Sequence, residues 1–192
     1  LWWRANARPH DECAEGPEES GSRARKGYVW GHVGWVLDGS KFATRLGRVK
    51  YFSKFPEVRF LDRFDIVVPT LLGVSVFLLG MALEKWAPGL GTNGWQMLVW
   101  GFVVSTIALY HGTFTVNSLA HVFGSRRFAT KDTSRNSFLI ALITLGEGWH
   151  NNHHHYPASA RQGFYWWEFD VSFYVPKALA AVGLVWDLRP VP

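Results

Sequence analysis

The chain has 192 residues, a formal net charge of +5 at pH 7 and a single cysteine, Cys13, which excludes an internal disulfide bond. Eleven tryptophans and an aromatic content of 16%, against only 18% charged residues, exceed what a typical soluble domain carries and are expected where a protein meets a membrane interface. The positive charge would suit nucleic acid or an anionic lipid surface, so its position along the chain has to decide between them.

The chain begins with a polar segment, residues 1–26, followed by an aromatic and basic segment, residues 27–63. Residues 1–26 mix both charges with glycine and proline and have no periodicity, which predicts loop or disorder. The segment does not begin with methionine and has no signal-peptide pattern, and we expect the chain to be a piece of a longer protein. Residues 27–63 are aromatic and basic, which predicts short helices lying on a cytosolic or interfacial surface.

The third segment, residues 64–118, contains two apolar runs without charges. Residues 66–83 and residues 95–118 both reach the length that crosses the hydrocarbon core of a bilayer. The connection between them is too short to cross back, so the runs predict a transmembrane helical hairpin. The alternative is a buried helical hairpin in a large soluble protein, although uncharged runs of this length are uncommon in soluble cores.

Positive charge gathers at the two outer ends of this hairpin. Arg59 and Arg63 precede the first run, whereas the charges in the connection cancel. The positive residues after the second run are Arg126, Arg127, Lys131 and Arg135. The positive-inside rule therefore predicts an integral protein of the inner (cytoplasmic) membrane with residues 1–63 and 119–192 on the cytoplasmic side. Because the charge follows the membrane runs, nucleic-acid binding is not expected.

Residues 119–192 contain the stretch "TLGEGWHNNHHHYP", which suggests metal chemistry. Thr144 and Glu147 have the spacing of a capping box and predict a short helix that ends before Pro157. This helix would contain His150, His153, His154 and His155. The first three share one face at i, i+3 and i+4, whereas the fourth points elsewhere and is not counted as a ligand. Imidazole-rich sites suit iron, zinc or copper.

A second polar element, "NSLAH", closes the second apolar run. Asn117 and His121 are four residues apart and face the same way on a helix. An asparagine amide can hold a metal-bound water, and a histidine at a membrane edge is costly enough to suggest a function. On its own His121 is better explained as a polar residue at the membrane interface. Its position on the same membrane side as the histidine cluster favours a metal site.

The stretch from "HGTFTVNSLAH" to "GEGWHNNHHHYPASARQGFYWWEFD" closely resembles the membrane fatty acyl desaturases of the acyl-CoA delta-9 type, especially the bacterial branch. The resemblance covers about residues 27–192. It implies an all-α membrane protein, in which the hairpin is part of a four-helix desaturase fold beneath a cytosolic helical cap. It also implies a di-iron centre with Asn117 holding a metal-bound water and with four ligands, His121, His150, His153 and His154.

The same resemblance implies an activity. Such enzymes use O2 and electrons from a small electron-transfer protein to introduce a double bond into an acyl chain, without a catalytic side chain beyond the metal ligands. The expected partners are the lipid bilayer and an acyl-CoA or another acyl carrier. Arg126, Arg127 and Arg161 would bind CoA phosphates or an acidic donor, although the positive-inside rule explains the first two equally well.

The N-terminal segment departs from the family pattern. A relative carries a His-x-x-x-x-His box and then a His-x-x-His-His box ahead of "GYVWGHVGW". Laying "WWRANARPHDE" on the second box puts Ala7, His10 and Asp11 at the three histidine positions, so only His10 remains as a candidate ligand. We therefore expect that this chain alone cannot hold two iron ions. A fragment, an altered reading frame upstream and a degenerate relative all explain the departure.

Two alternatives to a desaturase remain open at this point. A related hydroxylase could use the same ligands, since the outcome after hydrogen abstraction is not written in the histidine motif. A catalytically inactive desaturase-like subunit could instead pack against other membrane subunits in a larger assembly.

Overall fold

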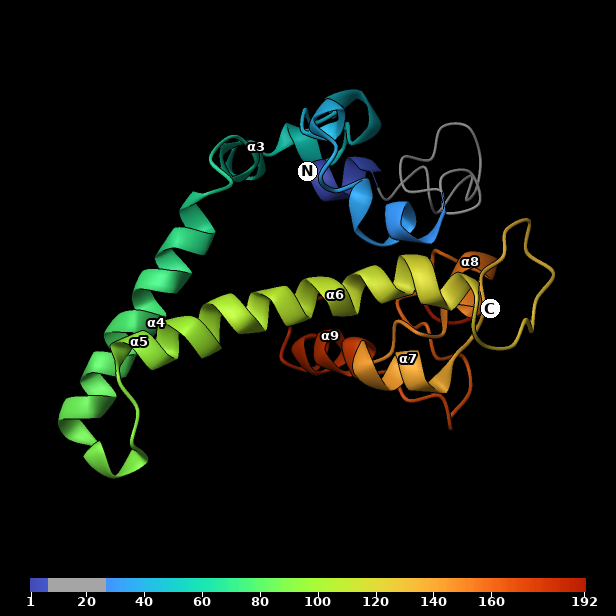
Figure 1. The fold of residues 1–192 in the computed structure, drawn as a ribbon. Helices are drawn as coiled ribbons and strands as arrows, with labels where there is room; N and C mark the ends of the chain where they lie inside the picture. Colours follow the sequence, from blue (N-terminus) through green and yellow to red (C-terminus); the bar gives the residue numbers. More distant parts are fainter. Residues whose placement is uncertain (7–26) are drawn as a thin grey trace. The chain divides into compact units, whose positions relative to one another are not determined.

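The computed structural model describes residues 1–6 and 27–192, and in this part of the chain every regular element is a helix (Figure 1). The all-α prediction is therefore confirmed for the described residues. They divide into two compact units. Unit 1 contains Leu1–Ala5 and Phe42–His111, and unit 2 contains Asn6, residues 27–41 and Gly112–Pro192.

Unit 1 consists of short helices followed by two long ones. Residues 2–6, most of them in this unit, are helical, so the prediction of loop or disorder for residues 1–26 was wrong for these residues, and residues 7–26 lie outside the described part. The further elements of unit 1 are the 3₁₀ turns η3 (Leu46–Arg48) and η4 (Phe52–Lys54), α3 (Pro56–Arg63), α4 (Val67–Trp86), the 3₁₀ turn η5 (Pro88–Leu90), α5 (Gly94–Gln96), the π-helical η6 (Met97–Val104) and the beginning of α6 (Ser105–Ser118). Helix α4 has 20 residues, which corresponds to about 30 Å of helix. Gly94–His121 forms a second helical stretch of 28 residues. Both are long and apolar enough to cross a bilayer, which confirms the two predicted runs.

The two long helices of unit 1 pack through small residues. A Cβ added to Gly80 of α4 would lie 2.6 Å from the carbonyl oxygen of Asn93, which precedes α5. Phe77 and Trp95 pack edge to face beside this contact, with ring centroids 5.0 Å apart. The Asn93 side chain accepts a hydrogen bond from the Gln96 N–H and begins α5. The short connection therefore returns the chain directly along α4.

The apolar side chains of these helices are largely exposed. Only 11% of the apolar window in α4 and 6% of that in the second stretch are buried within the described residues. These proportions do not fit a buried hairpin in a soluble core, since such helices are covered by protein. Trp86 and Trp95 flank the connection and are 77% and 69% exposed. Tryptophans at helix ends are typical of the membrane–water interface.

Unit 2 contains shorter helices and a polar interior. Its elements are the π-helical η1 (Trp30–Gly34), the 3₁₀ turn η2 (Gly39–Lys41), the end of α6, the 3₁₀ turn η7 (Leu119–His121), α7 (Phe138–Ile143), α8 (His150–His155) and α9 (Val171–Ala181). Isolated bridges join Ser125 to Asn136 and Asn136 to Trp149, so Asn136 connects the loop after η7 with the start of α8. The fully buried side chains of greatest volume in the described part are polar, with Glu168, Asn151 and Asn152 first among them. Such an interior requires a hydrogen-bond partner for each group.

Helix α8 begins later than the capping-box pattern predicts. Thr144 ends α7 instead, where its hydroxyl donates to the Ile140 carbonyl at 2.7 Å. Leu145 and Gly146 then adopt positive φ angles of 59° and 130°, which interrupt the helix. The first residue of α8 is His150, with no side-chain cap at Trp149. The capping-box prediction was therefore wrong, because the left-handed turn at 145–146 separates Thr144 from α8.

Candidate metal centre

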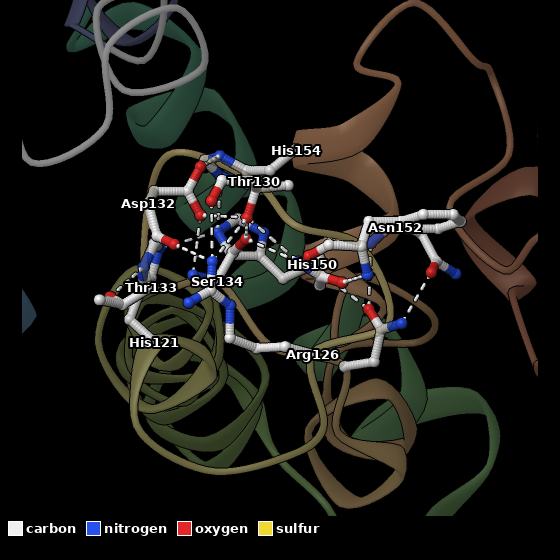
Figure 2. Close-up of polar contacts among 12 residues, drawn as sticks. His121, Arg126, Thr130, Asp132, Thr133, Ser134, His150, Asn152 and His154 are labelled. Carbon is white, nitrogen blue, oxygen red and sulfur yellow. Dashed lines mark hydrogen bonds and ion pairs between the residues drawn. The ribbon is translucent and has the colours of Figure 1, made fainter.

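Three buried imidazoles meet where η7 approaches α8 in unit 2 (Figure 2). His150 and His154 are one turn apart on α8, and His121 ends η7. The Nε2 atom of His150 lies 3.1 Å from Nε2 of His121 and 3.0 Å from Nε2 of His154. One potential ligand atom from each of the three residues lies within 4.8 Å of the others. The structure thus brings together three of the four predicted histidine ligands.

The spacing of these nitrogens fits ligands of one metal ion. Two imidazole nitrogens bound about 2.1 Å from the same ion at roughly a right angle are about 3 Å apart. The rings of His150 and His154 are inclined at 72° and those of His121 and His150 at 77°, so the Nε2 atoms converge without stacking of the rings. His121 and His150 are only 5% and 3% exposed. The donor set therefore fits a buried, nitrogen-coordinated transition metal.

The outer nitrogens of two of these histidines contact consecutive residues of one loop. Nδ1 of His154 lies 2.9 Å from Oδ2 of Asp132, and Nδ1 of His121 lies 3.2 Å from the Thr133 hydroxyl (Figure 2). Metal-binding histidines commonly donate their second N–H to a carboxylate or another oxygen, which leaves the opposite nitrogen for the metal.

The charge state of Asp132 is determined by burial and by hydrogen bonds. Burial alone would raise the pKa of the Asp132 carboxyl, but hydrogen bonds from His154 and Ser134 together lower that pKa far below its usual range. Asp132 is therefore a carboxylate at any pH near neutrality. A negative charge next to Nδ1 of His154 favours the protonated form of that nitrogen.

Two asparagines of α8 hold the helix against the surrounding loops. The side-chain oxygen of Asn151 accepts hydrogen bonds from the backbone N–H groups of Arg127 and Phe128 at 2.8 and 2.7 Å. The side-chain amide of Asn152 donates to Glu168 and to the Gln162 carbonyl, both at 2.9 Å. Sequence reasoning assigned no role to these residues. Asn152 lies on the face of α8 opposite His150 and His154, and that position was the available signal, because a buried amide there needs partners.

A buried glutamate completes this network. Glu168 is fully buried and accepts hydrogen bonds from Asn152, from the Tyr165 N–H at 3.2 Å and from Arg127 at 2.5 Å. The Arg127 guanidinium also lies over the Tyr165 ring, 4.5 Å from its centroid. The paired charges fix the segment after α8 against the loop before α7. Removing Arg127 would leave the Glu168 carboxylate buried without its cationic partner.

His153 lies beside the three-histidine cluster but outside it. Its ring centroid is 5.6 Å from that of His154 and 5.9 Å from that of His150. It interacts electrostatically with Glu147, whose pKa is raised mainly by burial and further by Asp170, against an opposing effect of His153. A second group of metal-binding residue types therefore adjoins the first.

The remaining candidates for metal binding are placed differently. Asn117 is half-buried one turn before His121, and among the described residues no hydrogen bond joins it to the cluster. His155 stacks on Phe128 with ring centroids 3.9 Å apart. His10 lies outside the described residues, as do Ala7 and Asp11.

The three predicted substrate-binding arginines have partners within unit 2. Arg126 donates to the backbone oxygens of Thr130 and Asp132 at 2.8 and 2.7 Å, and Arg127 binds Glu168 and Asn152. Arg161 donates to the Tyr165 carbonyl at 2.8 Å. Each of these contacts stabilises a loop, and a role in substrate binding stays a prediction.

The chain is similar to one protein family over most of its length. The family model described as "Fatty acid desaturase" matches residues 2–182. Similar proteins include palmitoyl-monogalactosyldiacylglycerol delta-7 desaturase of Arabidopsis thaliana, which is 34% identical over 97% of this chain and 47% of its own length. Icosanoyl-CoA 5-desaturase of Limnanthes douglasii is 33% identical over 98% of this chain and 50% of its own length. An sn-1 stearoyl-lipid 9-desaturase of Anabaena variabilis is 33% identical over 94% of this chain and 60% of its own length.

The similarity covers nearly the whole of this chain but only part of each relative. The chain spans about half the length of the curated relatives it matches. The family match begins at residue 2 and so includes most of the N-terminal segment, which the resemblance noted from the sequence did not cover.

Proposed function

Because this chain belongs to the fatty acid desaturase family, we propose that its protein introduces a double bond into a fatty acyl chain in an O2-dependent reaction at a di-iron centre. His121, His150 and His154 would hold one of the two ions. The overall reaction removes one hydrogen atom from each of two neighbouring carbons and reduces O2 to two molecules of water, with two electrons from a donor and two protons. Residues 2–182 would supply one part of the apparatus, since the matched relatives are about twice as long.

The observation that carries this proposal is the convergence of three Nε2 atoms at separations of 3.0 and 3.1 Å. In a family whose relatives are named as acyl-CoA and lipid desaturases, such a buried donor set supports an iron site. Iron with O2 supplies the oxidising power for removing hydrogen from an unactivated methylene group, which protein side chains lack. The protein's residues position the ion and exclude water from it, as the low exposure of His121 and His150 supports.

The second iron would require additional ligands. His153 is the nearest candidate within α8, since its ring lies beside that of His154 and it interacts electrostatically with Glu147. Asn117 would contribute through a bound water, and His10 would be a ligand only if the N-terminal segment retained part of a histidine box. The remaining ligands would come from parts of the protein outside this chain.

The proposed setting is the cytoplasmic face of a membrane. Two membrane-length helices and the distribution of arginine and lysine support an integral protein whose residues 1–63 and 119–192 are cytoplasmic. The substrate would be an acyl chain on CoA, on a membrane lipid or on another carrier, and the relatives named above include acyl-CoA and lipid desaturases. A small electron-transfer protein would supply the electrons. Arg126, Arg127 and Arg161 are proposed contacts for its acidic surface or for CoA phosphates.

The proposal is tested by expressing the full-length protein in a host without its own desaturase and analysing membrane acyl chains by gas chromatography and mass spectrometry. We expect monounsaturated acyl chains from the wild-type protein and none from His154→Ala, because one of three converging nitrogens is lost. The matched control is His155→Ala on the same helix, which removes a histidine outside the cluster and should retain activity.

The products also separate the alternatives. Hydroxylated acyl chains without unsaturation would replace the desaturase proposal with a hydroxylase on the same scaffold. Unchanged acyl chains with the wild-type protein, despite bound iron and a supplied electron donor, would favour a structural subunit. The family match and the names of the relatives do not favour that last role.

A further inference from the structure

The loop of residues 130–134 contacts two histidines that come from different elements. His121 ends η7 and His154 lies near the end of α8, yet their Nδ1 atoms contact the adjacent residues Thr133 and Asp132. Figure 2 shows both contacts on the side of the rings opposite the converging Nε2 atoms. One short loop thus reaches the outer edge of two of the three imidazoles.

This loop is itself firmly held. Oδ1 of Asp132 accepts hydrogen bonds from the Ser134 N–H at 2.8 Å and from the Thr130 hydroxyl at 3.2 Å. The Asp132 backbone oxygen accepts from Arg126 at 2.7 Å, and the Asp132 side chain is only 8% exposed. The two carboxylate oxygens of Asp132 therefore have different partners. Oδ1 shapes the loop, and Oδ2 is directed at His154.

We propose that Asp132, with Thr133, is a positioning residue for the metal site: it fixes the Nδ1–H tautomer and the orientation of His154, while Thr133 does the same for His121. A neutral imidazole has one protonated and one unprotonated nitrogen, so holding the proton on Nδ1 keeps the Nε2 lone pair directed at the metal. The adjacent carboxylate also increases the electron density of the His154 ring and strengthens its bond to a cation. This inference rests on the proposed metal site and adds residues outside its ligand set.

The Asp132→Asn variant distinguishes the role of Asp132 in orienting His154 from its role in shaping the loop of residues 130–134. Asp132→Asn keeps the size of the side chain, and its single amide oxygen can serve either the Ser134 N–H or the His154 Nδ1–H. If the oxygen serves Ser134, the NH₂ group meets His154 and favours the tautomer whose Nε2 carries the proton and cannot bind a metal. If it serves His154, the negative charge is still lost. Either arrangement weakens metal binding.

The test measures metal binding in the full-length protein in detergent. The Fe(II) dissociation constant is obtained by chelator competition, and the coordination geometry is read from the visible absorption of bound Co(II). We expect Asp132→Asn and Asp132→Ala to raise the dissociation constant by about 10- to 100-fold and to change the Co(II) spectrum. Thr133→Val should act in the same direction with a smaller change.

Asp170→Asn is the matched control. Asp170 is also fully buried in unit 2, but among the described residues its side chain accepts hydrogen bonds only from the backbone N–H groups of Gln162, Gly163 and Phe173. Its substitution should lower the Tm of the metal-free protein and leave the Fe(II) dissociation constant within about twofold, since no metal ligand loses a contact. Equal weakening in Asp170→Asn and Asp132→Asn would reject the positioning role in favour of general destabilisation.

The remaining outcomes are also decisive. A wild-type dissociation constant and Co(II) spectrum in Asp132→Asn would overturn the inference alone, with desaturation unaffected. If Asp132→Ala does not fold, Asp132→Asn and Thr133→Val carry the decision. Wild-type protein that binds Fe(II) but forms no double bond would reject the proposed function and leave the inference standing. Wild-type protein that binds no Fe(II) would reject both.

Discussion

At the scale of single residues, polar side chains around the three histidines of unit 2 are joined by hydrogen bonds and an ion pair. Asn151 and Asn152 each make hydrogen bonds to segments far from α8 in sequence, and Glu168 pairs with Arg127. Their hydrogen bonds hold α8 against the surrounding loops, so that His150 and His154 on the same helix have little freedom. An unsatisfied amide in such an interior costs about 1–3 kcal/mol.

Glu147 provides a pH-dependent prediction at this scale. Burial, with the nearby Asp170, raises its pKa above the ordinary value of 4.5, so the charged form is disfavoured in the folded protein. Above the raised pKa the carboxylate therefore lowers stability, and this penalty disappears as the pH falls through that pKa. We expect Glu147→Gln to raise the Tm of the metal-free protein at about pH 8 and to leave it unchanged near pH 4.

Thermal unfolding of the two proteins at both pH values checks this. Glu57→Gln, at an exposed position of α3, is the control and should have a smaller effect at either pH. A lower Tm for Glu147→Gln at about pH 8 would show that the carboxylate stabilises the fold in its charged form.

The sequence revealed the histidines of the site better than their surroundings. His121, His150 and His154 were predicted from i, i+4 spacing and from the resemblance, and the structure places them together. Asp132 and Thr133 were missed because they contact the histidines only after the chain has turned back through the loop before α7. Helical spacing relates residues within one turn of each other and gives no information about such distant contacts.

At the scale of elements, the bounds of the long helices were predictable, whereas the short helices of residues 27–63 were predicted only as a class and the start of α8 was not predicted. Uncharged runs of membrane length fix α4 and the Gly94–His121 stretch almost to their ends. The beginning of α8 depends on a left-handed turn at Leu145 and Gly146. A capping-box pattern at Thr144 competes with that turn, and Thr144 hydrogen-bonds back to α7 instead. Local sequence allowed both outcomes, and the packing of Gly148 against the Ala141 backbone accompanies the observed one.

The contact between α4 and α5 gives the prediction at this scale. Gly80→Ala places a Cβ 2.6 Å from the Asn93 carbonyl oxygen, so the backbone at one of these positions must move. We expect the free energy of unfolding to fall by about 1–3 kcal/mol. Gly89→Ala in η5 is the control, since no atom lies within 4 Å of a Cβ there. Thermal unfolding in detergent micelles should show a lower Tm for Gly80→Ala only. Equal Tm values for the two variants would mean that the helices are not in contact at Gly80.

At the scale of the whole molecule, the orientation in the membrane is the main prediction. The arginine and lysine distribution predicts that residues 119–192 lie on the cytoplasmic side and the connection between α4 and α5 on the other. In a Cys13→Ser background, we expect Gly89→Cys to react with an impermeant maleimide added outside sealed, right-side-out vesicles. Ala158→Cys, at an exposed position after α8, should react only after the vesicles are permeabilised.

Reaction of both cysteines from the same side would exclude a two-span topology. Reaction of Ala158→Cys alone from outside would invert the proposed orientation. The exposed Trp86 and Trp95 should in either case lie near the membrane surface that contains the connection.

The position of His121 has a consequence for how the protein is made. His121 directly follows a membrane-length helix, and His150 comes 29 residues later, beyond α7. The ribosome must therefore complete the second helix and the segment through His154 before the three nitrogens can meet. If the proposed iron site is correct, iron would bind only after this region is synthesised, and newly made protein would be exposed to degradation until it does. Limiting iron during growth should consequently shorten the cellular half-life of newly made protein, as a pulse-chase experiment would measure.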